Sequence, residues 1–153
     1  MTVITTIEDL RQLAEKRVPR MFYDYADSGS WTEGTYRANE RDFQGIKLRQ
    51  RVAVNMENRS TATTLVGQAA KMPVCIAPVG LTGMQHADGE IHAARAAEKF
   101  GIPFTLSTMS ICSIEDIAAN TSAPFFFQLY MMRDREAMAH MIDRCKAAKC
   151  SAL

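Results

Sequence analysis

Three apolar segments that each end in small or polar residues constrain the fold of this chain most strongly. They span residues 72–77, 102–106 and 123–127. Segments this apolar suit strands that are buried on both faces, as in a parallel sheet or barrel. The first runs into Gly80, the second into Ser107, and the third into Gln128 and Tyr130. Because the carboxyl ends of parallel strands meet at one rim, where such folds bind ligands, we expect these endings to form a site.

Helix signals follow each of these segments and predict a regular strand-helix alternation from residue 72 onward. Asp88 is placed to cap one helix that Gly101 ends, Ser113 to cap a second with Asp116 three residues later, and Asp134 to open a third. The third helix carries an apolar stripe that we interpret as core packing, made of Ala137, Met138, Met141, Ile142 and Cys145. Residues 149–153 resemble the start of a fourth strand, which gives three and a half units of an α/β fold.

The chain before residue 72 has a different character. A helical segment over about residues 1–45 is predicted: Thr5 or Thr6 caps a first helix, Pro19 suits the first turn of a second, and a third covers residues 31–43. The second helix is expected to stop near Gly29. Residues 46–71 are typical of irregular chain with short strands.

Composition narrows the class of protein. With 153 residues, 47% hydrophobic and 23% charged, the chain fits one ordinary globular domain and is not disordered. The net charge of +1 gives no general attraction to nucleic acid. There is no apolar run of about 18 residues and no signal peptide, so a cytoplasmic location is the default expectation. The cysteines are interpreted as reduced thiols without a metal site, because no Cys-x-x-Cys pair and no zinc-type spacing to His occurs: Cys75, Cys112, Cys145 and Cys150.

Five short motifs in order resemble a known family, the FMN-dependent L-2-hydroxy acid dehydrogenases and oxidases. This family includes L-lactate dehydrogenase, glycolate oxidase and mandelate dehydrogenase, and the likeness is greatest to the bacterial L-lactate dehydrogenase branch. The motifs are Tyr23-Asp24-Tyr25 followed by Ser28-Gly29, residues 39–43, Ala77-Pro78-Val79-Gly80, Thr105-Leu106-Ser107-Thr108, and Phe127-Gln128-Leu129-Tyr130. The resemblance covers the whole chain and implies the N-terminal part of a single domain, a TIM (β/α)8 barrel preceded by a helical segment.

The resemblance also implies a cofactor and its contacts. FMN would lie at the C-terminal rim, with the backbone at Pro78, Val79 and Gly80 against the flavin ring and with Ser107 and Gln128 hydrogen-bonded to it. Their chemistry agrees, because glycine has no Cβ to obstruct a flat ring and neutral hydroxyl and carboxamide groups donate or accept at flavin atoms without adding charge.

Two tyrosines are implied as substrate contacts. Tyr25 would hold the substrate carboxylate and Tyr130 would lie near its hydroxyl-bearing carbon. Without the resemblance, Tyr25 is better interpreted as a half-buried aromatic residue on an amphipathic helix. For Ser107 the residues alone leave Thr105 and Ser110 as alternatives.

The chain departs from the family in its missing later strands. The family's catalytic histidine, its lysine near the flavin, its substrate-binding arginine and its phosphate loops have no counterpart here, and His86, His92 and His140 do not lie in the catalytic motif. We therefore expect a fragment without a catalytic base, and we expect that this chain alone does not turn over substrate.

The expected reaction is the oxidation of an L-2-hydroxy acid, with lactate as the first candidate. A quinone, a carrier or oxygen would accept the electrons, and the complete protein would be a tetramer, cytoplasmic or peripheral to the inner membrane. A glycolate-type oxidase is the alternative within the family. A non-catalytic binding half-barrel is the alternative of another class.

Overall fold

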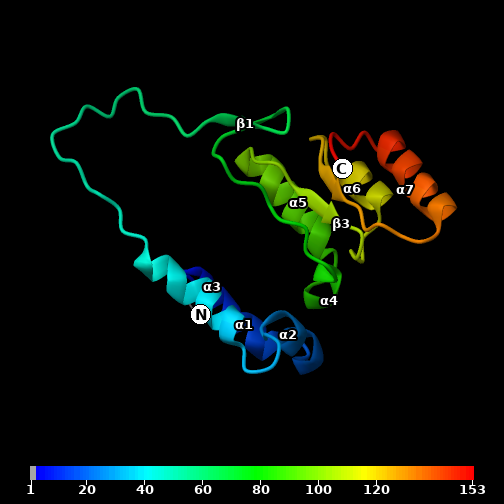
Figure 1. Ribbon diagram of the computed structural model, residues 1–153, viewed down its shortest axis with the longest axis horizontal. Coiled ribbons are helices and arrows are strands. Elements are labelled where there is room, and N and C mark those ends of the chain that lie inside the picture. Colours follow the sequence, from blue (N-terminus) through cyan, green and yellow to red (C-terminus); the bar gives the residue numbers. More distant parts are fainter. Residues whose placement is uncertain (1–2) are drawn as a thin grey trace. The chain divides into compact units, whose positions relative to one another are not determined.

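The computed structural model describes residues 3–153 of the chain. These residues belong to two compact units, Met1–Arg59 and Ser60–Leu153. The first unit is helical, and the second contains two small sheets with helices (Figure 1). The boundary between the two units lies within residues 46–71, where the sequence predicts irregular chain.

Short local signals set the helices of the first unit. Helix α1 (Ile7–Arg17) begins after Thr6, whose side chain accepts from the Asp9 backbone N–H while the Asp9 carboxylate accepts from the Thr6 N–H. The sequence left Thr5 and Thr6 open as caps, and the structure selects Thr6. Helix α2 (Arg20–Ala26) follows Pro19 and ends three residues before Gly29.

The third helix is shorter than predicted. Helix α3 (Gly34–Arg41) continues into a 3-10 helix, η1 (Asp42–Gly45). The prediction placed its start at Trp31, but Trp31 and Glu33 both have positive φ angles, of 56° and 58°. These left-handed conformations cannot belong to a right-handed helix, so α3 begins after them.

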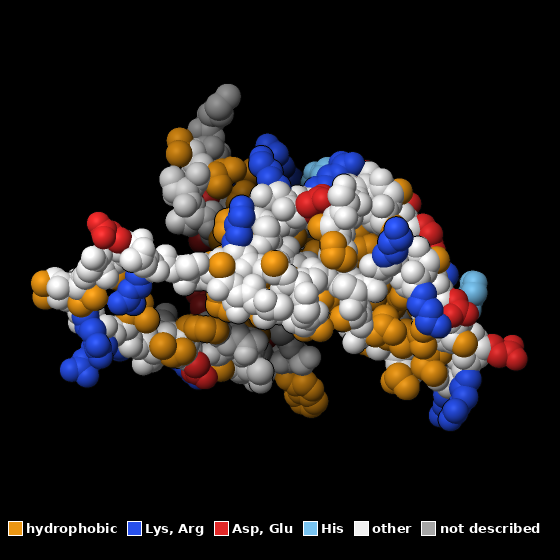
Figure 2. Space-filling model, turned by 90° about the horizontal axis from the view of Figure 1, so that it is seen from above, with side chains coloured by type: hydrophobic (Ala, Val, Ile, Leu, Met, Phe, Trp, Pro, Cys, Tyr) orange, Lys and Arg blue, Asp and Glu red, His pale blue; other side chains and the backbone are white. Residues whose placement is uncertain are grey.

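A polar cluster joins the three helices of the first unit. Asp27 accepts hydrogen bonds from Arg11 Nη1 at 2.9 Å, from the Tyr23 hydroxyl at 2.5 Å and from the Tyr36 hydroxyl at 2.9 Å. No residue of α1, α2 or α3 is buried. Hydrophobic side chains are accordingly visible at the surface of the molecule (Figure 2), and this unit depends on polar contacts more than on a core.

The second unit starts with a hairpin and continues as a parallel sheet. Strands β1 (Thr63–Leu65) and β2 (Gln68–Ala70) are antiparallel. Strands β3 (Thr105–Ser107) and β4 (Phe126–Gln128) are parallel. Single parallel bridges join Ile76 to Phe104 and Ala152 to Phe126. The four predicted strand segments therefore lie side by side in chain order, as in the first part of a parallel barrel.

Helices alternate with these strands (Figure 1). They are α4 (Thr82–Gln85), α5 (Gly89–Phe100), α6 (Ile114–Asn120) and α7 (Arg135–Ala147). Gly101, with φ of 86°, ends α5 as predicted, and Ser113 and Asp116 form the predicted capping box of α6. Asp134 caps α7 by accepting from the backbone of Glu136 and Ala137.

Three local expectations differ from the structure. The first strand is reduced to one bridge, and Val74 and Cys75 are exposed, because this strand has a neighbour on one side within the described chain. Asp88 precedes α5 but makes no side-chain cap, since its backbone is left-handed with φ of 55°. In the stripe on α7, Cys145 is buried whereas Ala137 is exposed.

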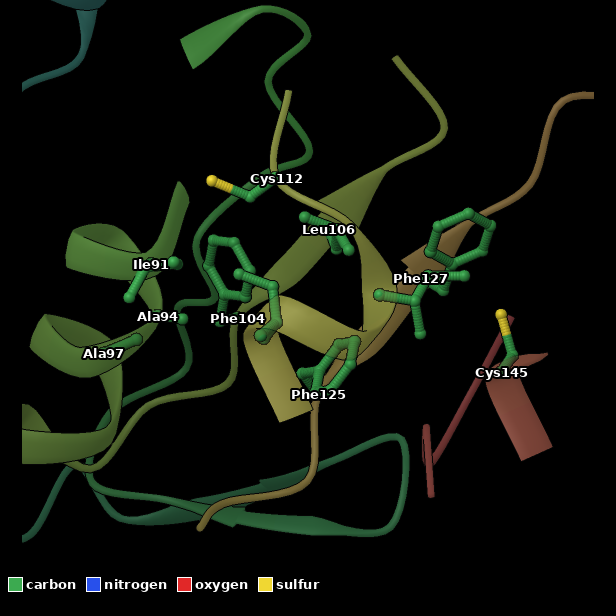
Figure 3. Close-up of a cluster of buried hydrophobic side chains, with 11 residues drawn as sticks. Ile91, Ala94, Ala97, Phe104, Leu106, Cys112, Phe125, Phe127 and Cys145 are labelled. Carbon is green, nitrogen blue, oxygen red and sulfur yellow. The ribbon is translucent and has the colours of Figure 1, made fainter. Parts of the chain in front are cut away.

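The core lies between the parallel sheet and its helices (Figure 3). Alternate residues of β3 and β4 point to the helical side, among them Leu106 and Phe127, where they meet Ile91 of α5 and Cys145 of α7 in one buried cluster. The intervening residues point to the other face of the sheet. This alternation assigns Ser107 and Gln128 to the face away from the helices.

No helix within residues 3–153 is long and apolar enough to cross a lipid bilayer.

Candidate functional site

Ser107 and Gln128 end adjacent parallel strands and form a pair. They are register partners of β3 and β4, and the Ser107 hydroxyl donates to Gln128 Oε1 at 3.2 Å. Ser107 is buried, at 5% exposed, and its Oγ also accepts from the Met109 N–H at 3.1 Å. Within residues 3–153, Gln128 Nε2 makes no hydrogen bond, so this amide can donate to a ligand at the rim.

Thr108 fixes the chain that follows β4. Its hydroxyl donates to the Gln128 carbonyl at 2.5 Å and accepts from the Tyr130 N–H at 3.1 Å. The Tyr130 ring is 52% exposed, so it is available to a ligand next to the Ser107–Gln128 pair. The sequence predicts no role for Thr108, and its place directly after Ser107 is the signal that could have indicated one.

The loop after the first strand brings an apolar surface to the same rim. Pro78 and Val79 are exposed, Val79 by 56%. A Cβ added at Gly80 would approach the Met109 Cβ to 3.2 Å, and the Leu81 N–H donates to the Met109 carbonyl at 3.0 Å. The loop can therefore lie close to the chain that follows β3 because residue 80 is glycine.

A small cavity lies between this loop and Ser107. Val79 and Ser107 both line it, and its volume is about 100 Å³. The structure thus brings together Val79, Ser107, Gln128 and Tyr130, which come from three consecutive strand ends. The adjacency of these strand ends follows from the parallel order of the strands, and the binding of a ligand by these residues stays a prediction.

Tyr25 belongs to the other unit. It lies on α2, and its ring is 64% exposed, which corrects the half-buried position expected from the helix pattern alone. The helix that carries it is held through Tyr23 and Asp27. An exposed phenol on a fixed helix can donate to a carboxylate ligand.

The residues at the rim fit a flavin. A flavin ring needs a flat apolar support and neutral hydrogen-bonding groups along its polar edge, and Pro78 and Val79 supply the first while the free amide of Gln128 supplies the second. None of the five residues assigned to the cofactor is charged: Pro78, Val79, Gly80, Ser107 and Gln128.

The side-chain contacts of the histidines within residues 3–153 do not include Ser107 or Gln128. The rings of His86 and His92 meet edge to face, with centroids 5.4 Å apart. His140 is exposed on α7. Neither arrangement presents a histidine to Ser107 or Gln128 through any hydrogen bond of the described residues.

Comparison with known proteins gives consistent matches along the chain. A family model described as FMN-dependent dehydrogenase matches residues 14–153. The L-lactate dehydrogenase of Ectopseudomonas mendocina is 47% identical over 151 residues, which cover 99% of this chain and 40% of that protein. The L-lactate dehydrogenase of Chromohalobacter salexigens is 48% identical over 146 residues, covering 95% of this chain and 37% of that protein.

Solved structures show the same likeness. A monotopic membrane protein, (S)-mandelate dehydrogenase, has a TM-score of 0.90 at 36% identity, over 97% of this chain and 40% of that one. A mandelate oxidase has a TM-score of 0.89 at 30% identity, over 97% of this chain and 43% of that one. The predicted fold class, part of a TIM (β/α)8 barrel, is confirmed. The chain spans about 40% of the length of the relatives that it matches.

Proposed function

Because the chain belongs to the FMN-dependent dehydrogenase family, we propose that the protein carrying it oxidises L-lactate to pyruvate. The observation that carries the choice of substrate is the difference in identity. It is 46–48% with L-lactate dehydrogenases, against 36–37% with (S)-mandelate dehydrogenases. The broader activity is the oxidation of a 2-hydroxy acid.

The reaction removes two electrons and two protons from the hydroxyl-bearing carbon and its oxygen. FMN, when bound, supplies the two-electron acceptor. In our proposal Ser107 and Gln128 hold the polar edge of the cofactor, and the backbone of residues 78–80 supports its ring. These contacts orient the acceptor, and they leave its charge unaltered because all of them are neutral.

The tyrosines position the substrate in this proposal. The Tyr25 hydroxyl donates to the substrate carboxylate, and Tyr130 lies near the carbon that is oxidised. A phenol stays protonated at neutral pH and can therefore act as a donor without forming an ion pair. Within residues 3–153, no histidine side chain is hydrogen-bonded to Ser107 or Gln128. We propose that the base that takes the hydroxyl proton lies outside this chain.

The remaining partners are proposed on the same basis. Electrons would pass from the cofactor to a quinone, a carrier or oxygen. The complete protein would be a homo-oligomer, a tetramer by resemblance, in the cytoplasm. Peripheral attachment to the inner membrane is the alternative location, and the monotopic (S)-mandelate dehydrogenase among the structural neighbours supports it.

The test is an assay of the intact protein that carries this chain. We expect a yellow protein with flavin absorbance that reduces an artificial dye with L-lactate, at a higher kcat/KM than with glycolate or (S)-mandelate. Preference for glycolate with stoichiometric hydrogen peroxide would indicate a glycolate-type oxidase instead. A colourless protein without flavin would contradict the proposal and indicate a non-catalytic binding protein.

A further inference from the structure

Glu90 is a buried charged residue in the face of α5 that packs on the sheet. It is 2% exposed and shares this face with Ile91, Ala94 and Ala97. Its Oε1 accepts from the backbone N–H groups of Gly83 and Ile111, each at 3.1 Å. Its Oε2 is buried without a hydrogen-bond partner among the described residues. Burying a carboxylate costs free energy unless it is hydrogen-bonded, so the two N–H groups that donate to Glu90 indicate its structural role.

The two donors belong to different loops of the rim. Gly83 lies in α4, the short helix within the connection that follows the first strand and carries residues 78–80, and Ile111 lies in the loop after β3, which carries Met109. The two loops fit closely, because a Cβ at Gly83 would come within 2.7 Å of the Ile111 Cβ. One carboxylate oxygen therefore joins two loops at the point where they are in contact.

The connection after the first strand contains residues in unfavourable left-handed backbone conformations. Leu81 and Asp88 both have positive φ angles, of 60° and 55°. Such conformations are unfavourable for residues with a side chain and persist when surrounding contacts enforce them. The Gly83 hydrogen bond to Glu90 lies between these two residues, and the Leu81 bond to the Met109 carbonyl adjoins it.

Glu90 also lines a cavity together with two residues that are predicted to contact the cofactor. Together with Val79 and Ser107 it lines the cavity of about 100 Å³ behind the rim. Burial raises the pKa of the Glu90 carboxyl, but the backbone N–H groups of Ile111, of Glu90 itself and of Gly83, together with the Cys112 thiol, outweigh it and hold that pKa below its ordinary value. The pKa of the neighbouring Cys112 thiol is raised to about 11, by burial first and then by Glu90. At neutral pH a charged acceptor thus faces the two loops, and charged acceptors form the stronger hydrogen bonds.

We propose that Glu90 is a positioning residue for the flavin site, which sets the loop of residues 78–80 against the loop of Met109. This assignment rests on the proposed FMN-dependent function. Glu90 does not touch the cofactor. It fixes the two loops on which Val79, Gly80 and Met109 lie, and so determines the surface against which the flavin ring packs.

The experiment compares Glu90→Gln with Glu98→Gln in the intact protein. Glu98 lies on the same helix and also accepts two backbone N–H groups, from Ser122 and Ala123 at 2.9 Å, but these precede β4 and lie at the opposite end of that strand from Gln128. FMN affinity is measured by quenching of flavin fluorescence, and the bound flavin by visible circular dichroism and midpoint potential. We expect Glu90→Gln to raise the FMN Kd about tenfold, or about 1.4 kcal/mol, and to change the flavin dichroism. Glu98→Gln should lower the Tm without changing either.

The possible outcomes distinguish a failure of the proposed FMN-dependent function from a failure of the role inferred for Glu90. Wild-type protein that binds no FMN would overturn the proposed function and this inference with it. Wild-type protein that binds FMN, together with a Glu90→Gln variant of equal affinity and unchanged dichroism, would overturn the inference alone.

A second pair of variants tests the same loops if Glu90→Gln does not fold. Gly83→Ala places a methyl group against Ile111, and Ile111→Gly removes the atoms that it meets. We expect Gly83→Ala to weaken FMN binding and the double variant Gly83→Ala/Ile111→Gly to recover it. Gly83→Ala with the FMN Kd of the wild type, or a double variant that recovers no affinity, would contradict the inference.

Discussion

At the scale of single residues, the two ends of the Gln128 side chain differ in their contacts. Oε1 accepts from Ser107, whereas Nε2 has no partner in the described chain. Replacing Gln128 by Leu keeps the volume and removes the group assigned to the flavin. We expect FMN binding to weaken by about 1–3 kcal/mol, because a polar atom of the cofactor is left unpaired. FMN titration of the intact protein, with far-ultraviolet circular dichroism to verify the fold, measures this. Equal affinity and equal flavin potential would show that Gln128 does not bind the cofactor.

Tyr25 offers a test of substrate binding that is independent of the cofactor. Tyr25→Phe deletes one donor to the substrate carboxylate, a loss of about 1.5–3 kcal/mol. The KM for lactate should therefore rise about tenfold or more. Tyr36→Phe is the matched control, since it also loses a phenol of the first unit, but one that donates to Asp27. A KM that is unchanged in Tyr25→Phe, or raised equally in both variants, would argue that Tyr25 has a structural role.

The sequence predicted some of these residues and could not predict others. Gln128 was accessible to sequence reasoning, because a carboxamide at the end of a buried apolar strand requires hydrogen-bond partners. The choice of Ser107 over Thr105 and Ser110 came from the family resemblance. Glu90 was not assigned a role. A glutamate in the first turn of a helix is common on electrostatic grounds, and the partners of Glu90, Gly83 and Ile111, are distant from one another in the sequence.

At the scale of elements, features that neighbouring residues determine were predicted from the sequence, whereas features that depend on distant parts of the chain were not. The capping boxes of α1 and α6 were predicted from four consecutive residues, and the structure contains both. The first strand was predicted to be buried, but the exposure of Cys75 depends on which strands lie beside it. Likewise the left-handed backbone of Asp88 is set by the loop before α5 and not by the capping residue type.

An ion pair between α6 and α7 gives a pH-dependent prediction. Arg144 donates to both oxygens of Glu115, at 2.6 and 2.8 Å, and this contact lowers the pKa of Glu115 from 4.5 to about 2. A lowered pKa means that the stabilisation is present above about pH 4.5 and is lost as the pH falls toward 2. Because Glu115 is 56% exposed, we expect Glu115→Gln to reduce the free energy of unfolding at pH 7 by less than about 1 kcal/mol.

Urea denaturation of the intact protein at pH 7 and at pH 4 measures the effect of Glu115→Gln. The difference from wild type should be smaller at pH 4. Asp143→Asn is the control, because Asp143 pairs with Lys146 within α7 and both side chains are about 70% exposed. A pH-independent difference for Glu115→Gln would contradict the assignment of the effect to this ion pair.

At the scale of the whole molecule, periodicity alone predicted consecutive strand-helix units, and the parallel order of the strands is confirmed. The closed barrel came from the resemblance, since three and a half units do not specify how a sheet of eight strands closes. The resemblance also supplied the role of Tyr25. No pattern within α2 distinguishes a ligand contact from an exposed aromatic residue.

The 153-residue chain produced alone is the subject of the last prediction. In it, the strand segments at Ile76 and Ala152 each have a bridge on one side within the described residues, and large hydrophobic side chains such as Val74 and Leu153 are exposed. Unpaired strand edges and exposed apolar surface favour association between chains. We expect the isolated chain to aggregate or to form a loose oligomer, and to retain FMN at well below one per chain.

The same chain should show no lactate-dependent dye reduction, because our proposal assigns to it the contacts that orient cofactor and substrate but not the base that removes the hydroxyl proton. Light scattering, the ratio of flavin to protein absorbance, and dye reduction with L-lactate test the three parts of this expectation, with the intact protein as the positive control. Robust lactate-dependent turnover by the isolated 153 residues would require a base among them, and His86, His92 and His140 would then be the residues to replace first.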